Sequence, residues 1–209
     1  SNRDMRSDNP SGADNQQERP SCSDWLDQIP DHDGFYVAGF VEGEGSFNVP
    51  IIREHDRTLP WRVTLSFNVS QRGPEMPMYL KGVFGVGRTR GRGDGVFYFE
   101  VTKPDDLEER VFPFFDRFSL RGPKALDLEV FREITKLVRS GRHRIPDGIR
   151  EIQSVLAREL AALGFDVEDR SDSLHLVARR VGAGPTLGWV THADTVALPE
   201  AQNVMVCEE

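Results

Sequence analysis

Two glutamates, Glu42 and Glu44, are the first side chains of the sequence whose type and spacing could do chemistry. They alternate with Gly43 and Gly45 in the segment FYVAGFVEGEGSF, residues 35–47. Carboxylates can transfer protons or ligate divalent cations. The question is therefore which elements position these acids, and why glycines interrupt the apolar helix that leads to them.

The helix that carries the acids is predicted by a broad apolar stripe, which we expect to pack on the protein's own core. The stripe comprises Phe35, Val37, Ala38, Phe40 and Val41. Gly45 is expected to release the chain from this helix into a strand.

Strand-like segments follow the helix. SFNVPII (46–52) and WRVTLSFNVSQ (61–71) predict two strands, and residues 86–103 predict a hairpin with an Arg-Gly-Arg-Gly-Asp-Gly turn. Apolar and polar residues alternate in the second segment, which is typical of a sheet with one buried and one polar face. Further helices are predicted over 76–85, 105–118 and 124–140. The expected fold class is α+β, a four-stranded antiparallel sheet with helices on one face.

Charge and composition divide the chain into three segments. Residues 1–33 carry 3 Lys/Arg and 8 Asp/Glu, residues 34–152 carry 19 and 17, and residues 153–209 carry 4 and 9, so the nets are −5, +2 and −5. The acidic average thus comes from the two ends and does not argue against a polyanionic partner for the middle. We expect a disordered lead over 1–23, a folded domain over 24–152 and a short α/β tail over 153–209.

Cysteine usage and hydropathy indicate an intracellular protein. Cys22 and Cys207 lie near opposite termini and provide neither a disulfide framework nor a zinc-ligand spacing. No apolar run of the sequence approaches the roughly 18 residues of a membrane span, and no leader opens the chain. We therefore expect a cytoplasmic protein that is not exported and does not enter a membrane.

The string VAGFVEGEG (37–45) resembles the signature of the LAGLIDADG homing endonucleases, position for position. Other segments look like this family in the expected order: LSFNVSQ (65–71), GVG (85–87), PFFDRFSLRGPKALDLEVF (113–131) and GRHRIPDGIREI (141–152). The resemblance implies the αββαββα homing-endonuclease fold and an intron-encoded, site-specific DNA endonuclease. Such an enzyme makes metal-dependent double-strand breaks at a long pseudo-palindromic target. Because the chain holds a single copy of the motif, the resemblance also implies a homodimer, with Gly39, Phe40 and Gly43 at its interface.

Four residues match catalytic positions of the family. Glu44 would be the metal-binding carboxylate, and two such acids across a dimer would hold Mg²⁺, or another divalent ion such as Mn²⁺. Gln71 would organise active-site water, and Arg121 with Lys124 would offset the charge of the transition state. Glu42 is expected to support the helix end. An ordinary strand-end glutamine and a solvated basic loop are the alternative interpretations of Gln71 and of the two cations.

The polar sheet face is the expected DNA-reading surface. Six residues of types that contact phosphates and purine edges lie along it: Asn48, Arg62, Asn68, Arg88, Arg90 and Arg92. Residues 47–103 carry 9 Lys/Arg against 5 Asp/Glu, a modest surplus, and binding to double-stranded DNA should weaken with salt. Pro50 and Ile52 depart from this polar pattern in the first strand.

Two other interpretations stay open. A chain that kept the fold without the chemistry would be a non-cleaving nucleic-acid binder, either an intron maturase that binds its own intron RNA or a DNA-binding regulator. Residues 156–196 resemble the start of an aminoacylase-type dizinc peptidase, in which His192 would be a zinc ligand and Asp194 the carboxylate beside it. A dizinc site needs further His and acidic ligands, which the rest of this chain does not provide. We therefore expect an inert fragment in the tail.

Overall fold

The computed structural model describes residues 24–53, 61–170, 175–179, 188–189 and 204–205. The lead predicted over 1–23 lies outside the described residues, as do His192 and Asp194. The described chain therefore covers the middle segment and part of the tail.

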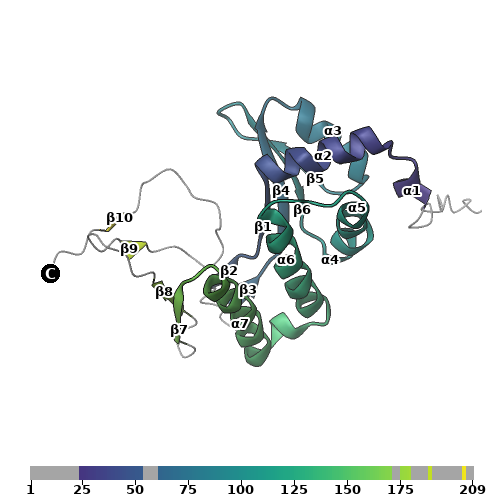
Figure 1. Cartoon of the computed structure of the whole chain (residues 1–209). Helices are drawn as coiled ribbons and strands as arrows, with labels where there is room; N and C mark the ends of the chain where they lie inside the picture. The colour runs from purple at the N-terminus through teal and green to yellow at the C-terminus, as the bar shows by residue number, and fades with distance from the viewer. Residues whose placement is uncertain (1–23, 54–60, 171–174, 180–187, 190–203, 206–209) are drawn as a thin grey trace, which may run out of the picture.

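A four-stranded antiparallel sheet forms the centre of the fold, with the strand order β1-β4-β6-β5 (Figure 1). Its strands are β1 (Gly45–Asn48), β4 (Ser66–Arg72), β5 (Arg88–Gly91) and β6 (Val96–Val101). A two-stranded ribbon of β2 (Ile51–Arg53) and β3 (Trp61–Val63) follows the β1–β4 pair. The predicted fold class is confirmed.

Each of the two long strands predicted over 46–52 and 61–71 is interrupted. Asn48 pairs with Ser66, and β2 pairs with β3 in the same register. Pro50 has no N–H to give to a ladder, and its carbonyl accepts a hydrogen bond from the Thr64 N–H at 3.0 Å. The prediction of two continuous strands was wrong at this point because the proline removes a ladder bond while the register is kept.

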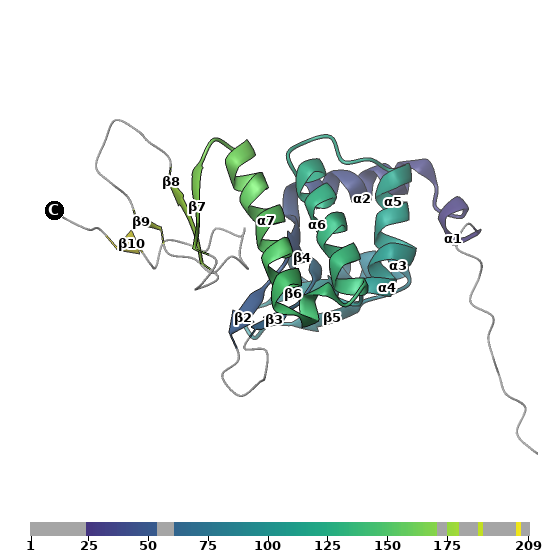
Figure 2. The same ribbon diagram turned by 90° about the horizontal axis from the view of Figure 1, so that it is seen from below.

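Helices cover one face of the sheet. They are α1 (Asp24–Asp27), α2 (Asp31–Glu44), α3 (Glu75–Phe84), α4 (Pro104–Asp106), the π-helix η1 (Leu107–Val111), α5 (Phe112–Arg117), α6 (Lys124–Arg139), the 3₁₀ turn η2 (Arg142–Arg144) and α7 (Pro146–Ala162). In Figure 2, α5, α6 and α7 stand side by side above the sheet. Helix α2 leads directly into β1, which begins at the next residue. None of the described helices combines the length and the apolar character that crossing a membrane requires.

An aromatic cluster fills the space between sheet and helices. Phe67, at the centre of the sheet, is fully buried, and its ring centroid lies 5.1–6.1 Å from those of Phe47, Phe84, Phe99 and Phe115. Aromatic pairs at such distances add about 0.5–1.5 kcal/mol each beyond the area that they bury. The cluster holds the apolar side of the sheet against the helices and leaves the polar side outward.

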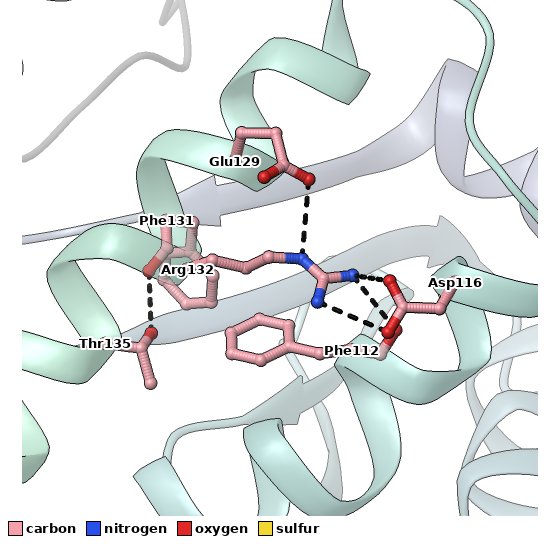
Figure 3. A network of polar contacts seen from close by, with 6 residues as sticks. All are labelled: Phe112, Asp116, Glu129, Phe131, Arg132 and Thr135. Carbon is pink, nitrogen blue, oxygen red and sulfur yellow. Dashed lines mark hydrogen bonds and ion pairs between the residues drawn. The ribbon is translucent and has the colours of Figure 1, made fainter.

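Arg132 joins α6 to α5 (Figure 3). Its guanidinium donates to the Asp116 carboxylate at 2.6 Å and to the Phe112 carbonyl at 3.0 Å, and it lies 4.7 Å from the centre of the Phe112 ring. Glu129 Oε1 lies 3.6 Å from the Arg132 Nε. Charge-assisted hydrogen bonds of this kind are stronger than neutral ones, so they fix α6, and with it Lys124 at its first position, against the core.

The buried face of α2 differs from the predicted apolar stripe. The residues on it are Gly34, Val37, Ala38 and Val41. Phe35 is 49% exposed, so the prediction that it packs in the core was wrong. The buried residue beside it is Gly34: the helix lies so close to the Phe118 ring that a Cβ at residue 34 would come within 2.3 Å of it. The half-exposed Phe35 ring packs edge to face with the same ring, with centroids 5.4 Å apart. Both residues thus contact Phe118, and the close approach of the helix backbone leaves room only for a glycine at the buried position.

Helix α7 runs across the domain boundary that we predicted at 152/153. Ile149, Ile152 and Val155 are buried in the same core as the sheet residues, and the helix continues to Ala162. The predicted boundary therefore falls inside a helix whose packing belongs to the first domain. Beyond α7 lie a pair of strands, β7 (Asp166–Arg170) and β8 (His175–Arg179), and a shorter pair, β9 (Gly188–Trp189) and β10 (Val204–Met205) (Figures 1 and 2).

Candidate active site

Glu44 stands at the junction of helix and sheet. It is the last residue of α2, and β1 begins at the next residue. Its side chain is exposed, and within the part of the chain that the structure describes, no hydrogen bond or ion pair engages its carboxylate. The backbone is thus fixed on both sides of an acid that is open to outside ligands.

Gly45 makes this sharp junction possible by its small size. Its backbone is extended, with φ −80° and ψ 158°, a conformation that any residue adopts. A Cβ at this position would come within 2.5 Å of Val41 Cγ1 and 2.7 Å of the Val41 carbonyl oxygen. Gly45 thus releases the chain from the helix into β1 as expected, and lack of space for a Cβ is what requires the glycine.

Gln71 lies at the same end of the sheet as Glu44. Gly45 pairs with Val69, and Gln71 follows two residues later on β4. Because side chains alternate along a strand, Gln71 shares its face with Phe67 and Val69, the side covered by helices. It is exposed there, beyond the end of the packed core. The structure thus brings Gln71 toward the end of α2 instead of placing it on the polar face.

The loop before α6 brings Arg121 and Lys124 to the end of α2. The Arg121 backbone N–H donates to Glu42 Oε2 at 3.1 Å, and Lys124 Nζ donates to the Glu42 carbonyl oxygen at 3.0 Å. The Arg121 side chain itself is exposed. Two of the predicted catalytic residues are therefore attached to the helix that ends at Glu44, and both attachments are made by Glu42.

Asp127 joins this group, although the sequence analysis did not identify it. It lies in the first turn of α6 and is half-buried. Burial raises the pKa of the Asp127 carboxyl, Lys124 works against this rise, and Glu42 adds to it. Its position three residues after Lys124 in a predicted helix is the signal that could have found it, because such residues face each other.

Glu44 is the side chain that the sequence predicts as a metal ligand. Among the described residues, no three His, Cys, Asp or Glu side chains lie close enough together to hold an ion. The open carboxylate of Glu44 is the type of ligand that Mg²⁺ takes, since this ion binds through one or two carboxylates and keeps water and phosphate as its other ligands. Glu44 therefore fits a divalent ion as one carboxylate ligand.

An exposed stripe runs along α2 toward Glu44. Nothing lies within 4 Å of where a Cβ would be at Gly39 or Gly43, and Tyr36, on the same side of the helix, is 58% exposed. Phe40 is half-buried and packs against the core and near Tyr36, with ring centroids 6.5 Å apart. Tyr36 was not predicted as part of this surface. Its spacing of three and seven residues before the two glycines would have placed it on their face.

The polar sheet face brings together four of the residues predicted to contact DNA. Asn48, Arg62, Asn68 and Arg88 line one open groove. The groove continues past the end of the sheet to three further basic residues that the sequence analysis did not assign: Arg139, His143 and Arg144. The Arg-His-Arg run of η2 was the available signal, and it was used only as part of the family resemblance.

The arginines of the β5–β6 hairpin are held by neighbours on the same sheet. Arg88 donates to Glu100 Oε2 at 2.9 and 2.7 Å, and Arg90 lies 4.9 Å from the centre of the Tyr98 ring. At the turn, Arg92 donates to Asp94 and to the Tyr98 hydroxyl. Arg88 and Arg90 thus project from the polar face in fixed geometry, whereas Arg92 lies at the hairpin end.

The described residues form an αββαββα unit. In this unit a helix that contains glycines places an acidic residue at the start of a four-stranded sheet, and this arrangement defines the class of protein. Residues 37–135 match the family model described as LAGLIDADG endonuclease. The resemblance of the middle segment to the LAGLIDADG endonucleases is confirmed.

Two curated relatives are named as probable intron-encoded endonucleases. The chain is 27% identical over 126 residues to "Probable intron-encoded endonuclease 3" of Neurospora crassa, and 28% identical over 112 residues to "Probable intron-encoded DNA endonuclease 1" of Mycosarcoma maydis. These matches cover 57% and 54% of this chain, but only 23% and 41% of the relatives. The chain thus spans less than half the length of the curated relatives that it matches here.

Solved structures of homing endonucleases share the fold. A complex of the meganuclease I-SmaMI with uncleavable DNA has a TM-score of 0.56 and 27% identity, covering 60% of this chain and 44% of that one. The homing endonuclease I-TnaI has a TM-score of 0.53 and 27% identity, covering 58% of this chain and 84% of that one. The same unit therefore corresponds to less than half of one neighbour and to most of the other.

Proposed function

We propose that the protein is a site-specific DNA endonuclease that acts as a homodimer and makes metal-dependent double-strand breaks at a long, pseudo-palindromic target. The observation that carries the proposal is the open carboxylate of Glu44 at the end of the bare α2 stripe. This function requires that the protein acts inside the cell and binds double-stranded DNA.

The homodimer is supported by the shape of the stripe. With no side chains at Gly39 and Gly43, a second helix can approach backbone to backbone. If a two-fold axis passes beside the stripe, the same contact is made by both copies, and Phe40 and Tyr36 flank it. The two Glu44 side chains then come close to each other. The match to 84% of the I-TnaI chain is consistent with one such unit being a complete protomer.

Two carboxylates brought together in this way repel each other unless a cation lies between them. A divalent ion such as Mg²⁺ or Mn²⁺ would supply an activated water and stabilise the leaving 3′ oxygen. One I-SmaMI structure holds its uncleaved DNA target in the presence of calcium ions. Gln71 would orient the attacking water from the end of β4, and the exposed Arg121 guanidinium, with the Lys124 ammonium, would offset charge on the phosphate.

DNA would lie along the polar face of the sheet. Two-stranded antiparallel ribbons fit the major groove, where Asn and Arg side chains read base edges. Asn48, Arg62, Asn68 and Arg88 line the groove on this face, and Arg90 lies on the same face. Arg92, at the hairpin end, would reach the flank of the site. Binding that depends on these arginines weakens as salt rises.

The test compares the parent chain with the Glu44→Gln variant on a plasmid that carries the joined sequences flanking the coding region. With Mg²⁺, the parent should make a unique double-strand break, and Glu44→Gln should cut at least about a thousandfold more slowly, because the variant cannot hold the ion. Glu159→Gln, on α7 far from the site, is the matched control and should cut like the parent.

A parent-like cleavage rate for Glu44→Gln would contradict the proposed site. Salt-sensitive binding to DNA or RNA with no Mg²⁺-dependent nicking by the parent would instead support the rival interpretation, a non-cleaving binder. Sedimentation of the parent as a single protomer at assay concentration, with DNA present, would overturn the homodimer.

A further inference from the structure

Glu42 has a different environment from Glu44, although only one residue separates them. Its carboxylate accepts the Arg121 backbone N–H at 3.1 Å, and its backbone carbonyl accepts from Lys124 Nζ at 3.0 Å. The side chain and the main chain of one residue are thus held by two residues of the segment that opens α6.

Gly122 provides the room for this contact. A Cβ at Gly122 would come within 2.3 Å of Glu42 Oε1, so the carboxylate lies directly on the glycine backbone. Within the described residues, Oε1 is buried and accepts no hydrogen bond. We refer to Glu42, Arg121, Gly122 and Lys124 together as the clasp.

The clasp provides a hydrogen-bond donor for a backbone carbonyl at the end of α2. The last carbonyls of a helix have no partner within it, and a lysine can bond them and interact favourably with the helix dipole. Lys124 does this at the carbonyl of Glu42, two residues before Glu44. The helix end and the loop, 79 residues apart at Glu42 and Arg121, are therefore fixed in one geometry.

We propose that Glu42 is a positioning residue for DNA cleavage: the clasp sets the distance between the Glu44 carboxylate and the two cations, Arg121 and Lys124. This inference rests on the proposed function. Glu42 itself touches neither the metal nor DNA. Its effect is on the rate of cleavage after DNA is bound, because the reacting groups must be correctly placed within a fraction of an ångström.

The experiment uses three variants of the full chain. Glu42→Ala removes the acceptor for Arg121, Glu42→Gln keeps an acceptor oxygen of the same reach, and Gly122→Ala pushes the carboxylate away from the opposite side. Glu159→Ala on α7 is the matched control. Three quantities are measured: the single-turnover cleavage rate at saturating protein with Mg²⁺, the Kd for the same DNA with Ca²⁺, and amide hydrogen exchange over residues 119–126.

Glu42→Ala should lower the single-turnover rate by about tenfold to a hundredfold, while its Kd stays within about threefold of the parent. Exchange at the Arg121 amide should become faster, since its acceptor is lost. Gly122→Ala should do the same, and Glu42→Gln should restore most of the rate and of the amide protection.

Cleavage by Glu42→Ala within about twofold of the parent rate, with the variant folded, overturns the inference. So does a rise in Kd or a fall in Tm that accounts for the whole loss, because that pattern belongs to a merely structural helix cap. A parent chain that binds but does not cut overturns the proposed function, and the positioning role with it. The Arg121 amide then still shows whether the clasp holds the loop.

Discussion

The same residue types have opposite environments in the packed interior and on the exposed side of α2. In the interior, Phe67 is fully buried and contacts four other rings. On the α2 stripe, Tyr36 is 58% exposed and the space over Gly39 is empty. The same contrast separates two acids, since Glu42 is held by the clasp and Glu44 is open. The interior is packed within one copy, whereas the stripe would be covered by a second copy in the proposed homodimer.

Removing Phe67 is expected to produce the largest effect on stability, because it tests the interior directly. Phe67→Ala should lower the free energy of unfolding by about 3–5 kcal/mol, since the cavity would open at the centre of the aromatic cluster. Urea denaturation at fixed protomer concentration measures the loss. Phe35→Ala, at a residue that is 49% exposed on α2, is the control and should lose much less. Equal losses of unfolding free energy in the two variants would contradict the contrast between the interior and the exposed side of α2.

The glycines of the stripe give effects of opposite sign on the protomer and on the dimer. Gly39→Ala with Gly43→Ala should stabilise α2 in the protomer by up to about 1 kcal/mol per site, because alanine is the better helix former and each new methyl enters open space. The same methyls should separate the two helices and weaken the dimer, which sedimentation measures.

Gly82→Ala on α3 is the matched control for the stripe. Gly82 is also a helix residue with nothing within 4 Å of its Cβ position. It should give a similar gain in protomer stability and leave the association constant unchanged. A dimer that tolerates alanine at both Gly39 and Gly43 would show that the stripe is an ordinary surface.

Substitution of Asp127 should give the smallest effect on stability, and this effect should depend on pH. Its folded-state pKa lies above the ordinary value of 3.8, so the folded chain holds the proton more tightly than the unfolded chain. Ionised Asp127 therefore opposes folding at neutral pH. Asp127→Asn should raise Tm there by no more than about 2 °C. The gain should shrink as pH falls through the raised pKa and vanish below the ordinary one. A gain that persists in acid would contradict this assignment.

The fold was largely predictable because its patterns are local. The alternation in LSFNVSQ and the turn residues between Arg90 and Val96 are patterns of neighbouring residues. Strand β4 forms over the first segment and strand β6 follows the turn, as expected. Pro50 was noted as a departure, yet its consequence was missed: the strand breaks while the register continues, with Thr64 bonded to the proline carbonyl. The outcome depended on a partner strand, which the sequence of one strand does not specify.

The candidate site was predictable only in part. Glu44 was found because a nine-residue string marks it, whereas the signals for Asp127 and Arg144 are weaker: a spacing of three residues from Lys124 and a short Arg-His-Arg run. Phe35 was assigned to the core from its apolar character, but Gly34 is the buried residue because the Phe118 ring lies against the helix backbone, and Phe35 packs against that ring while half exposed. Which of two adjacent residues faces inward depends on what packs against the helix, and Phe118 is far away in the chain.

The sequence by itself determined that a glycine-bearing helix would bring two acids to the start of an antiparallel sheet with one polar face. Those features follow from residue type and from the periods of helix and strand. Only the tertiary structure decided how the acids divide their roles, because Glu42 meets Arg121, Gly122 and Lys124 across a separation of about 80 residues. Loop closure at that separation depends on the whole core, and a local pattern contains no information about which loop arrives.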